Sequence, residues 1–180
     1  MRPLLLSLKP HYADLVFRGL KTAELRRRIP CVENRDVFVY VSSPIRQLRG
    51  GFRVEHVWSG SPEQVWEEVS EFARVEKQDF DAYYAGRTVA YALGIADVWE
   101  HERPVGLEGL RDRFLDFVVP QSWRYVKQEE YRYFQTLKRN PIQYGGSAQR
   151  EDSVRQDGHA CTWERATRAV TNAGRSAAIG

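Results

Sequence analysis

The sequence has little of what marks an exported, membrane-spanning or metal-holding chain. Among its 180 residues are only two cysteines, Cys31 and Cys161, which lie far apart and show no metal-like spacing. The four histidines form no metal pattern with the cysteines or with one another. No apolar run reaches the roughly 18 residues that a membrane helix needs. The apolar run near Met1 is short and ends at Lys9-Pro10, so we expect no export signal, no membrane contact and a cytoplasmic protein with free thiols.

Two familiar catalytic signatures are also missing. The chain has no glycine-rich loop of the kind that cradles phosphates and no nucleophile-elbow sequence. The sequence therefore gives no reason to expect a cofactor or a bound metal.

The composition and the distribution of charge are more informative. Hydrophobic residues make up 42% and charged residues 28% of the chain, which is typical of a globular domain. The formal net charge is only +3, but residues 1–28 carry seven Lys or Arg against two Asp or Glu. Residues 29–138 carry 14 against 18, and residues 139–180 carry six against four. A positive N-terminal stretch suits a polyanionic partner such as RNA without requiring one.

Hydrophobic periodicity predicts an α+β domain followed by a tail. The expected strands are 4–8, 21–27, 37–42, 52–58, 88–99 and 120–126. The expected helices are 10–18, a capped helix that begins after Ser61, 79–85, a turn and short helix within 104–113, and 129–138. This order favours a small, mixed, partly open β-barrel over residues 1–138 with the first helix at one end. Residues 139–180 predict a disordered tail, which could dock a protein partner.

The most informative stretch is the strand after the first helix. Gly19 suits the left-handed end of a helix, and Lys21, Glu24 and Arg26 follow within seven residues. Strand alternation places Glu24 and Arg26 on one face, toward a cleft or solvent, and Ala23 on the other, toward the core. A carboxylate between cations stays ionised and can accept hydrogen bonds from a base. The alternative is a solvent-exposed edge strand protected by its charges.

Other candidates extend this charged cluster. We expect Lys9, Ser42 and Ser43 to complete a ligand-binding pocket with Lys21, Glu24 and Arg26, and Arg27 and Arg28 to contact phosphate. A surface lysine and an ordinary Ser-Pro turn are the alternatives for Lys9 and for Ser42-Ser43. The aromatic side chains could stack on bases, but most are expected in the core.

At these residues the chain resembles the ASCH family (activating signal cointegrator homology), a branch of the PUA-like superfamily. The matching segments are Leu6-Ser7-Leu8-Lys9-Pro10-His11-Tyr12-Ala13, Gly19-Leu20-Lys21-Thr22-Ala23-Glu24-Leu25-Arg26-Arg27, Val39-Tyr40-Val41-Ser42-Ser43-Pro44, and Pro120-Gln121-Ser122-Trp123-Arg124-Tyr125. The resemblance covers roughly residues 1–138 and implies a PUA-like β-barrel whose cleft, lined by Lys21, Glu24 and Arg26, binds RNA or a nucleotide.

The resemblance also raises an enzymatic alternative, a small hydrolase that acts on a modified nucleoside amide or on RNA. A related amidohydrolase that deacetylates acetylated cytidine has a lysine matching Lys21 and a threonine nucleophile matching Glu24. Glutamate cannot replace that hydroxyl without changing the chemistry. If the chain is an enzyme, Lys21 and Glu24 are the expected catalytic residues, and otherwise none is. We therefore favour a binding module for RNA or a nucleotide over an enzyme.

Overall fold

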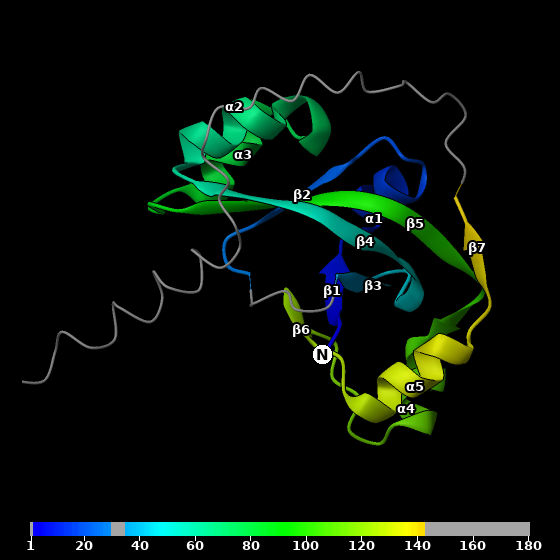
Figure 1. The fold of residues 1–180 in the computed structure, drawn as a ribbon. Helices are drawn as coiled ribbons and strands as arrows, with labels where there is room; N and C mark the ends of the chain where they lie inside the picture. The colour runs from blue at the N-terminus through cyan, green and yellow to red at the C-terminus, as the bar shows by residue number, and fades with distance from the viewer. Residues whose placement is uncertain (1, 30–34, 143–180) are drawn as a thin grey trace, which may run out of the picture. The chain divides into compact units, whose positions relative to one another are not determined.

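A computed structural model describes residues 2–29 and 35–142, which form one curled, mixed sheet with helices around it (Figure 1). The strands are β1 (Leu4–Leu8), β2 (Ala23–Arg26), β3 (Asp36–Val41), β4 (Gln47–Gly60), β5 (Ala90–Gly106), β6 (Trp123–Tyr125) and β7 (Arg139–Pro141). The helices are α1 (Pro10–Phe17), α2 (Pro62–Ala73), α3 (Lys77–Tyr84), α4 (Leu107–Arg113) and α5 (Gln128–Thr136). The α+β class and the partly open barrel predicted from the sequence are confirmed.

The strand order leaves the sheet with two ends that approach each other. The order is β2-β5-β4-β3-β1-β6, and β7 adds to β5 outside this path. The β1–β3 pair is parallel and the other pairs are antiparallel. No ladder joins β2 to β6 among the described residues; instead, Arg26 Nη1 donates to Ser122 Oγ (3.4 Å) and Trp123 Nε1 donates to the Arg28 carbonyl (3.0 Å). We call this junction, where β2 and β6 meet without backbone pairing, the seam.

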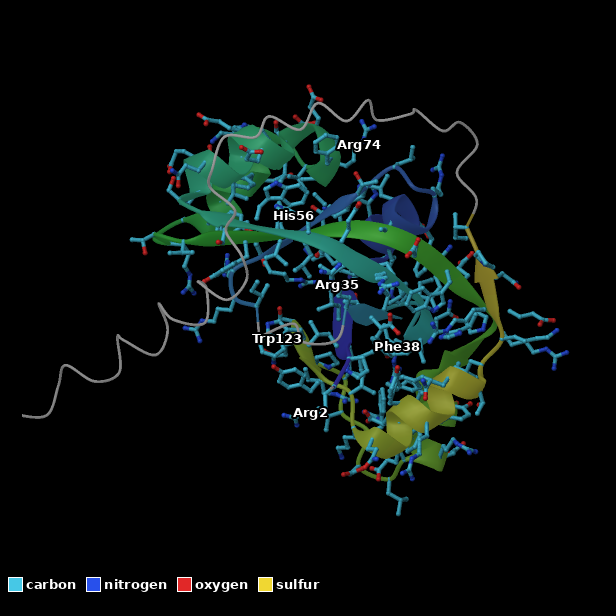
Figure 2. The ribbon with its side chains drawn as sticks, in the orientation of Figure 1. Arg2, Arg35, Phe38, His56, Arg74 and Trp123 are labelled. Carbon is cyan, nitrogen blue, oxygen red and sulfur yellow. The ribbon has the colours of Figure 1, made fainter. Side chains whose placement is uncertain are left out.

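Both faces of the sheet are covered, which explains the leucine run of β1. Leu4 and Leu6 pack with α1 on one face, and Leu5 packs on the opposite face with side chains of α4 and α5. Figure 2 shows Phe38 of β3 on that second face, where its ring lies 5.0 Å from the ring of Phe134 in α5. A third cluster places α2 and α3 over β2 and the first part of β5. A strand buried on both faces needs no polar alternation.

The hairpin of β4 and β5 is longer than the sequence predicts. The sequence pattern indicates that Gly50 and Gly51 open a strand, but β4 runs through them. A Cβ on Gly50 would overlap the Trp99 carbonyl, and one on Gly51 would overlap the Trp99 ring. The glycines thus permit a close crossing of β5 rather than mark a strand end. Likewise, β5 continues past Pro104 to Gly106, and α4 begins at the next residue, Leu107.

The end of the domain also needs a correction. Arg139–Pro141, assigned to the tail from the sequence, form β7 and pair with Trp99–His101 of β5. Proline and asparagine in this segment hid the strand, because both are depleted in strands. The predicted tail from residue 143 onward, and any partner that it docks, lie outside the described residues.

In the part that is described, no helix is long and apolar enough to cross a membrane, and no His, Cys, Asp or Glu cluster is placed to hold a metal.

Burial of His101 in β5 makes a pH dependence of stability predictable. The side chain is 3% exposed and stacks on Phe38 with ring centroids 6.5 Å apart. Burial and, next, the Arg139 cation lower the pKa of His101 from 6.5 to about 4. The unfolded chain therefore binds the extra proton first as pH falls through this window. We expect the free energy of unfolding to fall by about 3 kcal/mol between about pH 7 and about pH 4 from this group.

Urea unfolding at the two pH values measures this effect. His101→Leu should remove most of the acid-induced loss, whereas His56→Leu, at an exposed position of β4, should leave it unchanged. If the free energy of unfolding falls equally in wild type and His101→Leu as the pH is lowered, then groups other than His101 cause the acid destabilisation.

Candidate functional site

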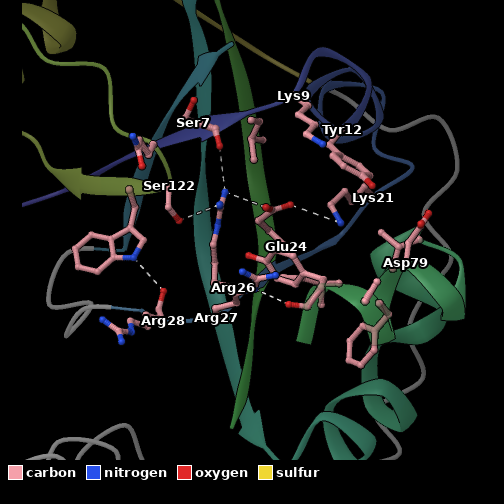
Figure 3. Close-up of a pocket in the computed structure, with 18 of the residues that line it drawn as sticks. Ser7, Lys9, Tyr12, Lys21, Glu24, Arg26, Arg27, Arg28, Asp79 and Ser122 are labelled. Atoms are coloured by element: carbon pink, nitrogen blue, oxygen red, sulfur yellow. Dashed lines mark hydrogen bonds and ion pairs between the residues drawn. The ribbon is translucent and has the colours of Figure 1, made fainter. Parts of the chain in front are cut away.

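A pocket of about 950 Å³ opens at the seam (Figure 3). Its walls come from the end of β1 and start of α1, from β2 and its flanks, from α3, and from the chain leading into β6. The lining residues are Ser7, Leu8, Lys9, Tyr12, Lys21, Glu24, Leu25, Arg26, Arg27, Arg28, Val75, Asp79, Phe80, Ala82, Tyr83, Arg87, Gln121, Ser122 and Trp123. The pocket therefore lies where the two ends of the sheet meet.

The local sequence sets the position of the charged strand. Gly19 adopts a left-handed φ of 70° and ends α1, and the amide of Lys21 donates back to the Leu15 carbonyl (3.1 Å). Alternation along β2 then turns Ala23 into the cluster beneath α2 and α3, and Glu24 and Arg26 toward the pocket. The predicted separation of Glu24 and Arg26 from Ala23 is thus seen in the structure, but Leu25, which shares the cluster of Ala23, also lines the pocket.

Three buried charges form the floor of the pocket. Lys21, Glu24 and Arg26 are 2%, 6% and 6% exposed. Glu24 lies between the cations: its Oε1 is 2.9 Å from Arg26 Nη2 and its Oε2 is 3.5 Å from Lys21 Nζ. These small exposed fractions rule out the alternative of a solvent-exposed strand protected by its charges.

Arg26 joins the floor to the opposite side of the seam. Its Nη2 donates to the Ser7 carbonyl at 3.5 Å and its Nη1 to Ser122 Oγ at 3.4 Å, and both bonds are long. Its Nε is buried and has no hydrogen-bond partner among the described residues. Besides its 2.9 Å ion pair with Glu24, the Arg26 guanidinium thus has one N–H that no described residue accepts, and an unsatisfied buried donor of this kind can mark a functional site.

The surroundings of Lys21 lower the pKa of its ammonium group. Its Nζ donates to the Ala73 carbonyl at the end of α2 (2.5 Å) and lies 5.4 Å from the centre of the Tyr12 ring. Burial lowers the pKa of Lys21 below its usual value, and the Glu24 carboxylate opposes this shift. Burial, together with Asp79 and Glu24, raises the pKa of Tyr12, so that its hydroxyl stays protonated.

Helix α3 is fixed to the charged strand and forms one side of the pocket. The Tyr84 hydroxyl lies within hydrogen-bond distance of the carbonyls of Arg26 (3.2 Å) and Tyr91 (2.9 Å), which share its one proton, and burial raises the pKa of this phenol. Arg27 reaches the same helix, where its Nε donates to the Tyr83 carbonyl (2.5 Å) and its guanidinium lies 4.5 Å from the Tyr83 ring centre. The α3 wall is therefore held in place by β2 and the residue that follows it.

Positive charge dominates the lining. Four exposed cations, Lys9, Arg27, Arg28 and Arg87, surround the buried group, and Asp79 is the one exposed carboxylate among the residues that line the pocket. With Lys21, Glu24 and Arg26 included, six cations face two carboxylates. A polar floor with a cationic rim can accept a neutral, hydrogen-bonding group inside and an anion at the mouth.

The structure brings together most, but not all, of the residues proposed from the sequence. Lys9, Lys21, Glu24, Arg26, Arg27 and Arg28 all line the pocket. Ser42 and Ser43 do not, because they follow β3 on the β4 side of β1, away from the seam. The Ser42 amide donates to the Leu8 carbonyl (2.8 Å), and its own carbonyl accepts from Ile45 in the turn. Their position is explained by this turn.

Sequence reasoning missed several lining residues. Periodicity assigns Tyr12 to an apolar helix face. Trp123 of the closing strand is one of the aromatic residues that could stack on bases, although most of these are expected in the core. Ser7, Ser122 and Arg87 carry no local signal, because their place in the pocket depends on which strands meet. Thr22, the hydroxyl next to the charged group in sequence, is not among the lining residues. The hydroxyl groups of the lining come from Ser7, Tyr12, Tyr83 and Ser122.

Fold and site define a small α+β domain with a charged pocket at the open seam of a curled sheet. The chain belongs to the ASCH family, whose domain model matches residues 6–111. This confirms the resemblance found in the sequence and covers β1 to α4, including the charged strand. Ser122 and Trp123 lie beyond the matched residues.

Among the similar proteins, two carry the name of this family. A protein named "ASCH domain-containing ribonuclease" from Zymomonas mobilis subsp. mobilis is 29% identical over 128 residues, covering 69% of this chain and 84% of that protein. A crystal structure of ASCH from Zymomonas mobilis matches with a TM-score of 0.70 and 26% identity, over 76% of this chain and 96% of the other. The large ribosomal subunit protein uL22 of Ureaplasma parvum serovar 3 is 30% identical over 105 residues, which is 58% of this chain and 34% of that protein.

Proposed function

We propose that this protein binds RNA in the seam pocket. The observation that carries the proposal is the buried Lys21–Glu24–Arg26 group at the floor of a pocket with a cationic rim. A similar protein is named a ribonuclease, and this supports RNA rather than another polyanion as the ligand. A free nucleotide would use the same floor and is the smallest ligand to test.

The floor has unused hydrogen-bonding capacity for a base. An ionised carboxylate has about four acceptor positions, and Glu24 uses one oxygen toward Arg26 and the other toward Lys21. Its remaining positions can accept the exocyclic amine of a base. Lys21 and Arg26 can donate to base carbonyl or phosphate oxygens, and Arg27 and Arg28 at the rim can contact the backbone.

Fluorescence anisotropy with a short labelled single-stranded RNA tests the proposal. We expect saturable binding that weakens as salt rises from about 50 mM to about 200 mM, because phosphate contacts release counterions. The Arg27→Ala variant should bind less tightly and show a smaller salt dependence. Arg103→Ala is a matched control, since Arg103 is exposed in β5 and does not line the pocket. Absence of binding, or equal effects of the two substitutions, would overturn the proposal.

Cleavage of RNA is a second candidate function, supported by the name of the similar protein and by the lowered pKa of Lys21. A lysine that loses its proton more easily can take the proton of a ribose 2′-hydroxyl as a general base; the 2′-oxygen then bonds to phosphorus, the bond to the 5′-oxygen breaks, and the 5′-oxygen takes a proton from water. Arg26 could then stabilise charge on the phosphate. Incubating labelled RNA with wild type and with Lys21→Met, at RNA concentrations that saturate both proteins, separates the two functions. Products formed by wild type alone would indicate cleavage, and intact RNA with normal binding would indicate a binding module.

A further inference from the structure

A strip of aromatic and arginine side chains continues from the pocket along β6. Trp123 lines the pocket, and its ring lies 6.0 Å from the ring of Tyr125 in an edge-to-face arrangement. The Arg2 guanidinium lies 4.6 Å from the Tyr125 ring centre. The backbone carbonyl of Arg28 accepts a hydrogen bond from Trp123 Nε1. Figure 2 shows Trp123 and Arg2 on the same side of the molecule. We call Trp123, Tyr125, Arg28 and Arg2 the β6 strip.

The position of β6 explains why this strip stays partly open. β6 is the last strand of the sheet and pairs only with β1 among the described strands. Trp123 and Tyr125 are two residues apart and share a face, and both are half-buried, whereas Arg2 and Arg28 are exposed. Both rings pack against the core cluster that contains Leu4 and Leu6, so only part of each ring faces solvent.

The Trp123 ring is held in place before any ligand binds. Its Nε1 donates to the Arg28 carbonyl at 3.0 Å, which ties the ring to the segment that follows β2. The same bond brings Arg28, an exposed cation, next to an aromatic surface. An aromatic face beside an arginine matches one nucleotide, with a base to stack and a phosphate to neutralise.

We infer that the seam pocket binds one nucleotide of a longer single strand and that the β6 strip binds the next one. This rests on the proposed function, because it assumes RNA in the pocket. The base of the neighbouring nucleotide stacks on Trp123, and Arg28 contacts its phosphate. Stacking reads no base edge, so this second position tolerates any base. A duplex is excluded, because its bases are already stacked and paired.

A length series of single-stranded oligonucleotides, from a mononucleotide to a pentanucleotide, tests the inference by anisotropy competition. We expect the pentanucleotide to bind wild type at least about tenfold tighter than the mononucleotide, in line with one added stacked base. Trp123→Ala should weaken pentanucleotide binding more than mononucleotide binding and so remove most of that gain. Trp123→Phe, which keeps an aromatic face, should retain much of it. Arg28→Ala should reduce the salt slope for the pentanucleotide by about 0.7.

The chain offers a matched control elsewhere. Arg113 of α4 lies 4.3 Å from the ring centre of Tyr133 in α5, an arginine–aromatic pair that does not line the pocket. Tyr133→Ala and Arg113→Ala should leave the length dependence unchanged. Equal affinity for all lengths, equal loss at all lengths in Trp123→Ala, or duplex binding as tight as single-strand binding would overturn the inference while leaving RNA binding in the pocket intact. Failure of every length to bind would overturn the proposed function as well.

Discussion

Replacing Lys21 with methionine is expected to weaken RNA binding about thirtyfold without unfolding the domain. The buried ammonium lies at the floor of the pocket, and a hydrogen bond to a charged group contributes about 2 kcal/mol. Methionine keeps much of the side-chain volume but cannot donate. Glu24 remains paired with Arg26 at 2.9 Å, so the substitution does not leave an isolated buried carboxylate.

Lys138→Met provides the control for this prediction. The Lys138 side chain is 83% exposed and pairs with Glu102 at 3.0 Å, outside the pocket, so its removal changes the net charge by the same amount. Anisotropy titrations of both variants with the same RNA, together with their thermal unfolding, separate a local effect from a general electrostatic one. Equal losses of affinity in the two variants would mean that Lys21 contributes only to the overall charge.

Replacing Glu24 with glutamine is expected to lower the free energy of unfolding by about 3 kcal/mol or more, because it leaves two buried cations without their carboxylate. Lys21 and Arg26 are almost fully buried on either side of it. Chemical denaturation measures the change. Glu67→Gln, at an exposed position of α2, should change stability by less than about 0.5 kcal/mol.

The Glu24→Gln variant also tests whether the pocket can bind an anion. Without Glu24, sulfate should bind between the two uncompensated cations and raise the unfolding temperature of Glu24→Gln more than that of wild type. Adding Lys21→Met to Glu24→Gln should recover part of the lost stability, because it removes one of those cations. A loss of stability like that of Glu67→Gln, or one unaffected by sulfate and by the second substitution, would contradict the electrostatic coupling of these three residues.

The charged floor could be predicted from the sequence because its geometry is local. Gly19 ends a helix, and strand alternation then fixes which side chains of β2 share a face. This local pattern correctly places Glu24 and Arg26 on the side opposite Ala23. What the sequence could not show is their burial, since only the packing of α2, α3 and β6 around the strand excludes water from them.

The other side of the pocket depends on topology, which no local pattern encodes. Ser122 and Trp123 reach Arg26 and Arg28 only because the sheet curls until β6 meets β2. For the same reason Ser42-Ser43, which follow a strand as polar residues often do at functional sites, are not in the pocket. Their strand pairs with β1 on the side away from the seam.

Glycine and proline obscured the bounds of β4 and β5. Gly50 and Gly51 permit a close crossing of the two strands instead of ending one of them. Pro104 lies within β5 rather than after it. In both strands glycine or proline indicates an unusual local backbone. Whether the strand continues through it depends on pairing with the neighbouring strand, which the local sequence does not show.

The most direct test of RNA binding at the seam is a nuclear magnetic resonance titration of the isotope-labelled full chain with a single-stranded pentanucleotide. We expect the backbone amide signals of Lys21, Glu24, Arg26, Ser122 and Trp123 to shift in proportion to bound RNA, and those of α4 and α5 to stay in place. Shifts confined to α4 and α5, or no shifts at RNA concentrations that saturate the anisotropy signal, would contradict a binding site at the seam.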